Sequence, residues 1–84
     1  MTDLKTTELK VGDYVQWCVG FKDFDTGKVI DVDDERVVIA STWLKEKIEY
    51  RHDEAGREFI LSDRQKVLCD EVADAIAARD EVKL

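Results

Sequence analysis

Two runs of β-branched residues lie on either side of a short acidic turn near the middle of the chain. The runs cover residues 28–32 and 36–41, and the turn is Asp33, Asp34 and Glu35. Val and Ile favour extended backbone while Asp favours turns, so the pattern predicts a β-hairpin. Because a hairpin alone cannot bury its apolar face, further strands or a helix must cover it. The chain is therefore expected to be mainly β.

Similar patterns predict strands on both sides of this hairpin. Tyr14, Val15, Trp17 and Val19 follow a turn dipeptide that begins at Gly12. Residues 48–51 and 57–61 flank a polar turn, and this pair predicts a second hairpin. Residues 20–27 carry mixed side chains, and we expect a loop there. The sequence thus predicts about five short strands.

The spacing of apolar residues changes to that of a helix at Ser62. Ser62 and Gln65 match a capping box, and apolar side chains then recur at helical spacing. This pattern predicts one amphipathic helix from about residue 63 to residue 81, which covers the sheet. The expected organisation is a flexible N-terminal tail (residues 1–8) followed by a single domain (residues 9–84). In that domain, residues 9–61 form a small barrel and residues 62–82 form the C-terminal helix.

The length and charge of the chain limit the functions that we expect. A domain of 84 residues buries a small core, and a deep catalytic cleft would compete with that core for apolar side chains. We therefore expect that the protein is not an enzyme and uses no cofactor. The net charge of −7 disfavours non-specific binding to nucleic acid and suits a partner with a basic surface.

The same sequence argues for a cytoplasmic protein. No apolar run is long enough to span a membrane, and the first ten residues lack the apolar core of a secretory signal. Cys18 and Cys69 lie far apart in apolar contexts, so we expect two reduced, buried thiols.

The order of these elements resembles a known type of barrel. Val11, Gly12 and Asp13 lead into the first strand, Gly27 and residues 28–32 form the second, and the acidic turn and residues 36–39 follow. Residues 10–61 thereby resemble a small SH3-like barrel of the KOW or Tudor kind. The resemblance implies binding of RNA, DNA, peptides or proteins through loops at one end of the barrel. The chain differs from the nucleic-acid-binding members near Gly27, where acidic residues outnumber basic ones.

The densest charge in the sequence lies at the central turn, at Asp31, Asp33, Asp34 and Glu35. Their spacing is similar to that of a calcium loop, but Arg36 stands where such a loop needs Gly. We therefore expect no metal. The turn is either simply solvated or a docking surface for a basic partner. Acidic residues of the predicted helix would extend this negative surface: Asp63, Asp70, Glu71, Asp74, Asp80 and Glu81.

Aromatic residues supply a second candidate surface. Trp17 lies within a predicted strand and is expected in the core. Phe21, Phe24 and Trp43 lie outside the predicted strands, and they either pack under the helix or stay exposed at one end of the barrel. Exposed rings would form a hot spot for a partner protein or a stacking platform for bases.

Basic residues give the alternative interpretation. Lys45, Lys47 and Arg51 would share one face of a strand with Glu49, and Arg57 follows nearby. Such a stripe either binds phosphate or is a solvated face with ion pairs. His52 is the only histidine and is expected in an exposed turn. One His and two Cys are too few for a structural zinc site.

From these residues we expect a non-enzymatic acidic binding module. It would be a small cytosolic regulator or inhibitor that docks on another protein, and one form of it is a nucleic-acid mimic of the kind that phages encode. The alternative is a nucleic-acid-binding SH3-like or KOW-like barrel. The residues expected to bind a partner protein are Asp31, Asp33, Asp34, Glu35, Phe24 and Trp43. The residues expected to bind nucleic acid in the alternative are Lys45, Lys47, Arg51 and Arg57.

Overall fold

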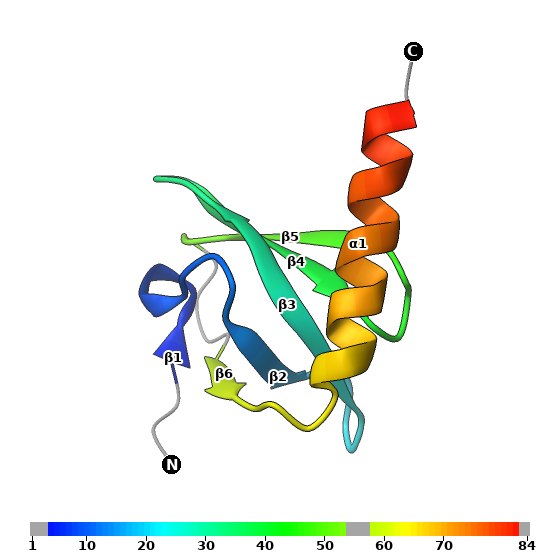
Figure 1. Ribbon diagram of the computed structural model, residues 1–84. Helices are drawn as coiled ribbons and strands as arrows, with labels where there is room; N and C mark the ends of the chain where they lie inside the picture. The colour runs from blue at the N-terminus through cyan, green and yellow to red at the C-terminus, as the bar shows by residue number, and fades with distance from the viewer. Residues whose placement is uncertain (1–3, 54–57, 83–84) are drawn as a thin grey trace.

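A computed structural model describes residues 4–53 and 58–82, and residues 80–82 by their backbone alone. Within these residues the chain forms one curled, half-barrel sheet of six strands and one C-terminal helix (Figure 1). The elements are β1 (Leu4–Lys5), the short 3-10 helix η1 (Thr6–Glu8), β2 (Tyr14–Cys18), β3 (Phe24–Val32), β4 (Arg36–Ser41), β5 (Lys47–Arg51), β6 (Glu58–Leu61) and α1 (Lys66–Val82). The predicted mainly β fold with a C-terminal helix is confirmed.

The sheet has the strand order β1-β6-β2-β3-β4-β5, and its neighbouring strands are antiparallel. The β3–β4 hairpin around the acidic turn is confirmed. The predicted second hairpin is wrong, because β6 pairs with β2 and β1 while β5 lies at the opposite edge. The turn predicted near Gly56 lies outside the described residues. Phe59 accounts for the placement of β6, since its fully buried ring packs 5.5 Å from the ring of Trp17.

The first half of β3 was predicted as part of a loop, and this prediction is wrong. β3 begins at Phe24, and the backbone of β4 approaches it closely at Gly27. A Cβ atom at Gly27 would lie only 2.5 Å from the carbonyl oxygen of Ala40. Glycine is therefore required by the contact between the two strands, although glycine is a poor strand former in general.

The N-terminal segment contains secondary structure that the sequence does not predict. Leu4 and Lys5 form β1 on the edge of β6, and Thr6 in η1 is buried. The sequence predicted a flexible tail here because residues 1–8 show no apolar period. A two-residue strand has too few positions to show such a period. Residues 1–3 lie outside the described part of the chain.

The main core fills the inner face of the curled sheet. Trp17 lies at its centre, as predicted, and its indole Nε1 donates a hydrogen bond of 2.9 Å to the hydroxyl of Tyr50. Satisfying this polar atom allows a large ring to be buried without loss of hydrogen bonding. The buried members are Leu9, Val15, Trp17, Val29, Val37, Ile39 and Phe59.

Helix α1 packs on the outer face of β3 and β4, as predicted (Figure 1). Its buried residues Val72, Ala73 and Ile76 contact Ala40, with Ile30 beside them. The helix begins at Lys66, and the predicted capping box is wrong because the Ser62 hydroxyl accepts from the amide of Arg64. No helix in the described ranges is long and apolar enough to cross a bilayer.

The two cysteines differ in environment. Cys69 lies in α1 and is buried, as predicted, and burial raises the pKa of its thiol. Cys18 is exposed, so the prediction of a second buried thiol is wrong. The alternation of β2 explains this result, because Val15 and Trp17 point into the core and Cys18 lies one position beyond Trp17.

Candidate docking surfaces

The residues predicted as one docking site lie at the two ends of β3. Phe24 begins this strand, and Asp33 follows its last residue. At about 3.3 Å per residue, the two positions are separated by roughly 30 Å. Trp43 lies with Phe24 and not with the acidic turn, because its amide donates to Asp25, the neighbour of Phe24. The structure therefore contains two candidate surfaces instead of one.

We call the first surface the aromatic end, and it consists of Phe21, Phe24, Trp43 and Leu44. Their side chains are 95%, 58%, 60% and 59% exposed. Phe21 lies in the β2–β3 connection, Phe24 begins β3, and Trp43 and Leu44 lie in the β4–β5 connection. Soluble proteins rarely expose several large apolar side chains together unless the patch binds something.

A buried carboxylate holds the aromatic end in shape. Asp25 is 2% exposed, and its carboxylate accepts hydrogen bonds from the hydroxyl of Ser41 and the amide of Trp43, the latter at 3.2 Å. It also accepts from the amide of Thr26 at 2.7 Å. The Thr42 amide donates to the carbonyl of Thr26 at 2.9 Å. These bonds tie the β4–β5 connection to the start of β3 and fix the backbone of Trp43.

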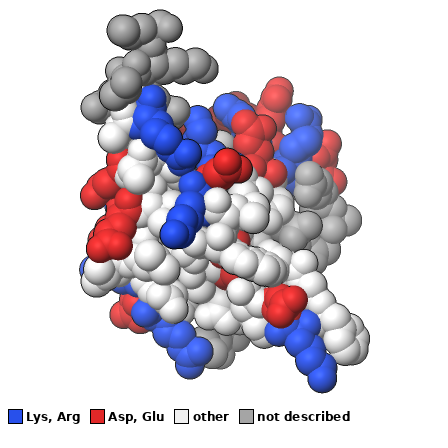
Figure 2. Space-filling view, turned by 90° about the vertical axis from the view of Figure 1, so that its right-hand side faces the viewer, with Lys and Arg blue, Asp and Glu red and all other residues white. Residues whose placement is uncertain are grey.

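Helix α1 begins beside the same end of the sheet (Figure 1). Its first turn exposes Val67 and Leu68, while the thiol of the next residue, Cys69, interacts with Thr26 of β3. Figure 2, which looks at this side of the molecule, shows a broad uncharged area with charged side chains mostly around it. The exposed apolar side chains of Val67 and Leu68 on α1 thus add to those of the aromatic end.

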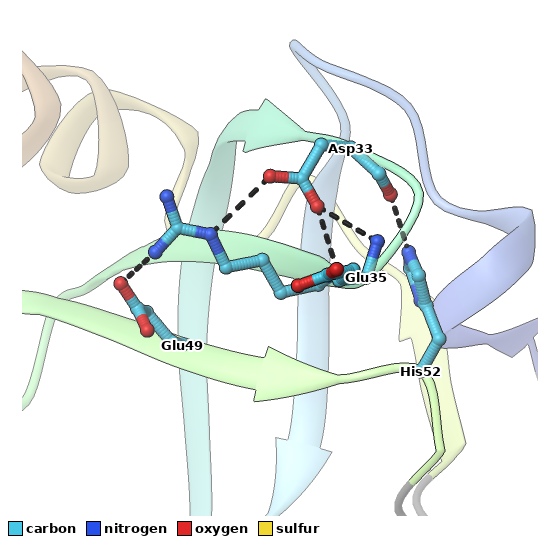
Figure 3. Close-up of polar contacts among 5 residues, drawn as sticks. Asp33, Glu35, Glu49 and His52 are labelled. Atoms are coloured by element: carbon cyan, nitrogen blue, oxygen red, sulfur yellow. Dashed lines mark hydrogen bonds and ion pairs between the residues drawn. The ribbon is translucent and has the colours of Figure 1, made fainter.

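The second surface is the acidic turn, formed by Asp31, Asp33, Asp34 and Glu35. Figure 3 shows that the side chain of Asp33 is used within the turn. Its carboxylate accepts from the amides of Glu35 and Arg36 at 2.8 and 2.9 Å, and from the guanidinium of Arg36. Arg36 in turn forms an ion pair with Glu49 of β5. Asp33 therefore shapes the turn, and its carboxylate already accepts three hydrogen bonds from within it.

His52 also holds the acidic turn in place. Its Nε2 lies 2.8 Å from the carbonyl oxygen of Asp33, and its Nδ1 lies 3.1 Å from the hydroxyl of Thr6 (Figure 3 shows the former contact). Because a carbonyl only accepts, Nε2 carries the hydrogen. His52 lies in a turn, as predicted, but it is half-buried, so only the predicted exposure is wrong. The ring is a structural link between η1 and the turn.

Asp31, Asp34 and Glu35 remain exposed at the acidic turn. The structure shows no ion pair between them and any other described residue. The turn thus presents negative charge on a backbone that Asp33 and His52 have fixed.

The predicted acidic helix face is less uniform. Asp70 binds Lys28 and Tyr14, Glu71 and Asp74 are exposed, and the side chains of Asp80 and Glu81 lie outside the described part.

The role of Asp33 predicts a distinctive acid titration. Hydrogen bonds from the backbone amides of Glu35 and Arg36 lower the pKa of Asp33 from its ordinary value. Because folding lowers this pKa, the carboxylate stabilises the turn above pH about 3.9 and this stabilisation is lost as the pH falls through the folded-state pKa. In an NMR titration, the amides of Glu35 and Arg36 should shift with a midpoint below pH about 3.9. Asp33→Asn should abolish this step, and a midpoint above pH about 4 in the wild type would contradict the assignment.

The basic residues do not form a continuous positive stripe. Lys47, Glu49 and Arg51 share the exposed face of β5, as predicted, but Lys45 lies in the preceding turn with a φ of 57°. Arg51 is paired with Asp53 at 3.3 Å. The fourth residue of the predicted set, Arg57, lies outside the described residues.

The described residues also limit the chemistry of the site. Among residues 4–53 and 58–82, no three His, Cys, Asp or Glu side chains are arranged to hold a metal ion.

No family model, curated protein or solved structure matches this chain. Function is therefore inferred from the residues and their geometry.

Proposed function

We propose that this protein is a small binding module that docks on a partner protein through the aromatic end. The observation that carries the proposal is the exposure of Phe24, Trp43 and Leu44 on backbone that Asp25 fixes. Aromatic anchors on a fixed backbone lose little conformational entropy on binding, and they contribute most to hot spots in interfaces. A regulator or inhibitor with such a surface would act by covering a part of its partner.

The negative charge of the chain gives the proposed partner its chemistry. A net charge of −7 attracts a protein with a basic surface and increases the rate of encounter. Asp34 and Glu35 add charge at a fixed turn, far from the aromatic end. We propose that they steer the partner and contribute less to the stability of the complex than the aromatic residues do.

The resemblance of residues 10–61 to SH3-like barrels supports the same location. Proteins of that kind bind mostly through loops at one end of the barrel. Phe21 and Trp43 belong to two connections at one end of the sheet, beside the start of β3. We therefore propose that the half-barrel is SH3-like and binds at this end.

Binding of nucleic acid through β5 has less support. Glu49 lies between Lys47 and Arg51, and Arg51 is already paired with a carboxylate. Each phosphate contact needs an available cation, and the chain as a whole would repel phosphate.

A paired substitution tests the proposal. Phe24→Ser together with Trp43→Ser should reduce capture of the partner from a cell lysate by at least about tenfold, because each hot-spot ring contributes about 2 kcal/mol or more. Val11→Ser is the matched control, since Val11 is 63% exposed and lies outside the aromatic end. The Val11→Ser variant should capture as much partner as the wild type does. The melting temperatures of all variants should lie within a few degrees of the wild-type value.

A second pair of substitutions separates steering from docking. Asp34→Lys with Glu35→Lys should slow association at low salt, and the difference from the wild type should shrink as salt screens the charges. If the serine pair at Phe24 and Trp43 captures the partner as well as the wild type does, the aromatic end is not the docking surface. If capture needs only the acidic turn, the relative roles proposed for the two surfaces are reversed.

A further inference from the structure

Strand β5 offers an open edge for pairing. It is the last strand of the sheet and pairs with β4 alone among the described strands. The amide of His52 donates to the carbonyl of Glu35, and the amide of Ser41 donates to the carbonyl of Glu46. Even-numbered residues of β5 therefore direct their backbone groups toward β4. By the alternation of an antiparallel ladder, the N–H and C=O groups of Glu49 and Arg51 face away from the sheet.

The exposed face of β5 carries alternating charges. Lys47, Glu49 and Arg51 point outward from the strand, and the exposed Asp53 follows two residues later. The signs read positive, negative, positive, negative along the chain. When two copies of this strand run antiparallel and are centred on Tyr50, each charged residue faces a residue of opposite charge.

We propose that β5 pairs with β5 of a second copy of this chain, antiparallel and about a twofold axis at Tyr50. In this register, Glu49 of each copy lies opposite Arg51 of the other, and Lys47 faces Asp53 in the turn that follows the partner strand. The outward backbone groups of Glu49 and Arg51 then bond to each other across the interface. The two half-barrel sheets become one continuous sheet with an isologous contact.

The charges select this register over its neighbours. An axis at Glu49 would place Glu49 against itself and Lys47 against Arg51, so that like charges face each other. An axis at Ile48 would pair Lys47 with Glu49, but it would place Arg51 opposite Lys45, a like charge in the turn before the strand. Directly opposed like charges destabilise a strand pair, whereas opposed unlike charges stabilise it.

The neighbouring strand supports the same arrangement. Arg36 of β4 lies directly opposite Arg51 of β5, and each already recruits a carboxylate, Glu49 and Asp53 respectively. The Glu49 carboxylate of a second copy would approach this pair of arginines from the open side. The interface thus adds an anion where two cations are adjacent. Because each copy carries a net charge of −7, we expect the association to be weak.

Sedimentation equilibrium of the intact chain tests the pairing. The wild type should show a dimer whose fraction rises with concentration between about 1 μM and 1 mM. Glu49→Lys alone and Arg51→Glu alone should each be monomeric, because each places like charges opposite each other in its own dimer. An equimolar mixture of the two variants should dimerise again, since every opposed pair in the mixed dimer is of unlike charge.

Glu49→Pro provides a second test that does not depend on charge. It removes an outward N–H that makes no bond to β4, so the fold should persist while the dimer is lost. Phe24→Ser with Trp43→Ser should dimerise like the wild type, which separates this proposal from docking at the aromatic end. The proposal is wrong if the wild type remains monomeric throughout the range. It is also wrong if the single charge variants dimerise normally, or if folded variants fail to combine when mixed.

Discussion

Gly27→Ala is expected to lower the free energy of unfolding by about 3 kcal/mol or more. The added Cβ would lie 2.5 Å from the carbonyl oxygen of Ala40 and 2.6 Å from Cγ2 of Ile39. The oxygen belongs to the backbone of β4, so it cannot move away without disturbing the β3–β4 ladder. A domain of this length has a total stability of about 4–13 kcal/mol, and the variant is expected to lose a large part of it.

Gly20→Ala is the matched control for this substitution. A Cβ at Gly20 would meet Asp23 Oδ2 at 3.4 Å, which is an ordinary contact with an exposed side chain. Urea denaturation should therefore place Gly20→Ala within about 0.5 kcal/mol of the wild type and Gly27→Ala far below it. Equal midpoints for the two variants would mean that β3 and β4 do not meet as closely as described.

Asp25→Ala should cost about 3 kcal/mol or more, because it removes the acceptor of several hydrogen bonds at once. The buried Ser41 hydroxyl and the part-buried amides of Thr26 and Trp43 would lose their partner, and an unsatisfied donor costs up to about 1–3 kcal/mol when it is fully buried. Asp25→Asn keeps an acceptor oxygen and should lie between the wild type and the alanine variant. Chemical denaturation measures all three.

The same variant should loosen the aromatic end. Without Asp25, hydrogen exchange of the Trp43 amide should accelerate more than that of amides in the main core. Asp23→Ala controls for charge, since Asp23 is an exposed aspartate in the same hairpin. If Asp23→Ala and Asp25→Ala are equally stable, the buried carboxylate does not hold the β4–β5 connection.

Much of the fold follows from local sequence patterns. The β-branched run of β4 and the helical period after Ser62 predict elements that the structure contains. The beginning of β3 is different, because Asp25 and Gly27 are poor strand formers whose presence is explained only by Ser41 and Ala40 on another strand. The partner of β6 is set by contact between Phe59 and Trp17, which are distant in sequence. Local propensity contains no information about such contacts.

The candidate site was predictable in its residues but not in its geometry. Aromatic and acidic residues were identified, whereas the length of β3 that separates Phe24 from the acidic turn was not. Exposure of Trp43 was one of two open alternatives, and the structure decides it. Nothing in the sequence distinguishes the buried Asp25 from its exposed neighbour Asp23. The partial burial of His52 was not predictable either, because its contact with Thr6 joins segments far apart in the chain.

Hydrogen exchange of the intact chain, with and without the partner that it captures, tests the proposed docking surface most directly. Binding at the aromatic end should protect the amides of residues 20–25 and 42–46, with little change at Asp34, Glu35 and the middle of β5. Protection confined to the acidic turn, with unchanged exchange around Phe24 and Trp43, would contradict docking through the aromatic end.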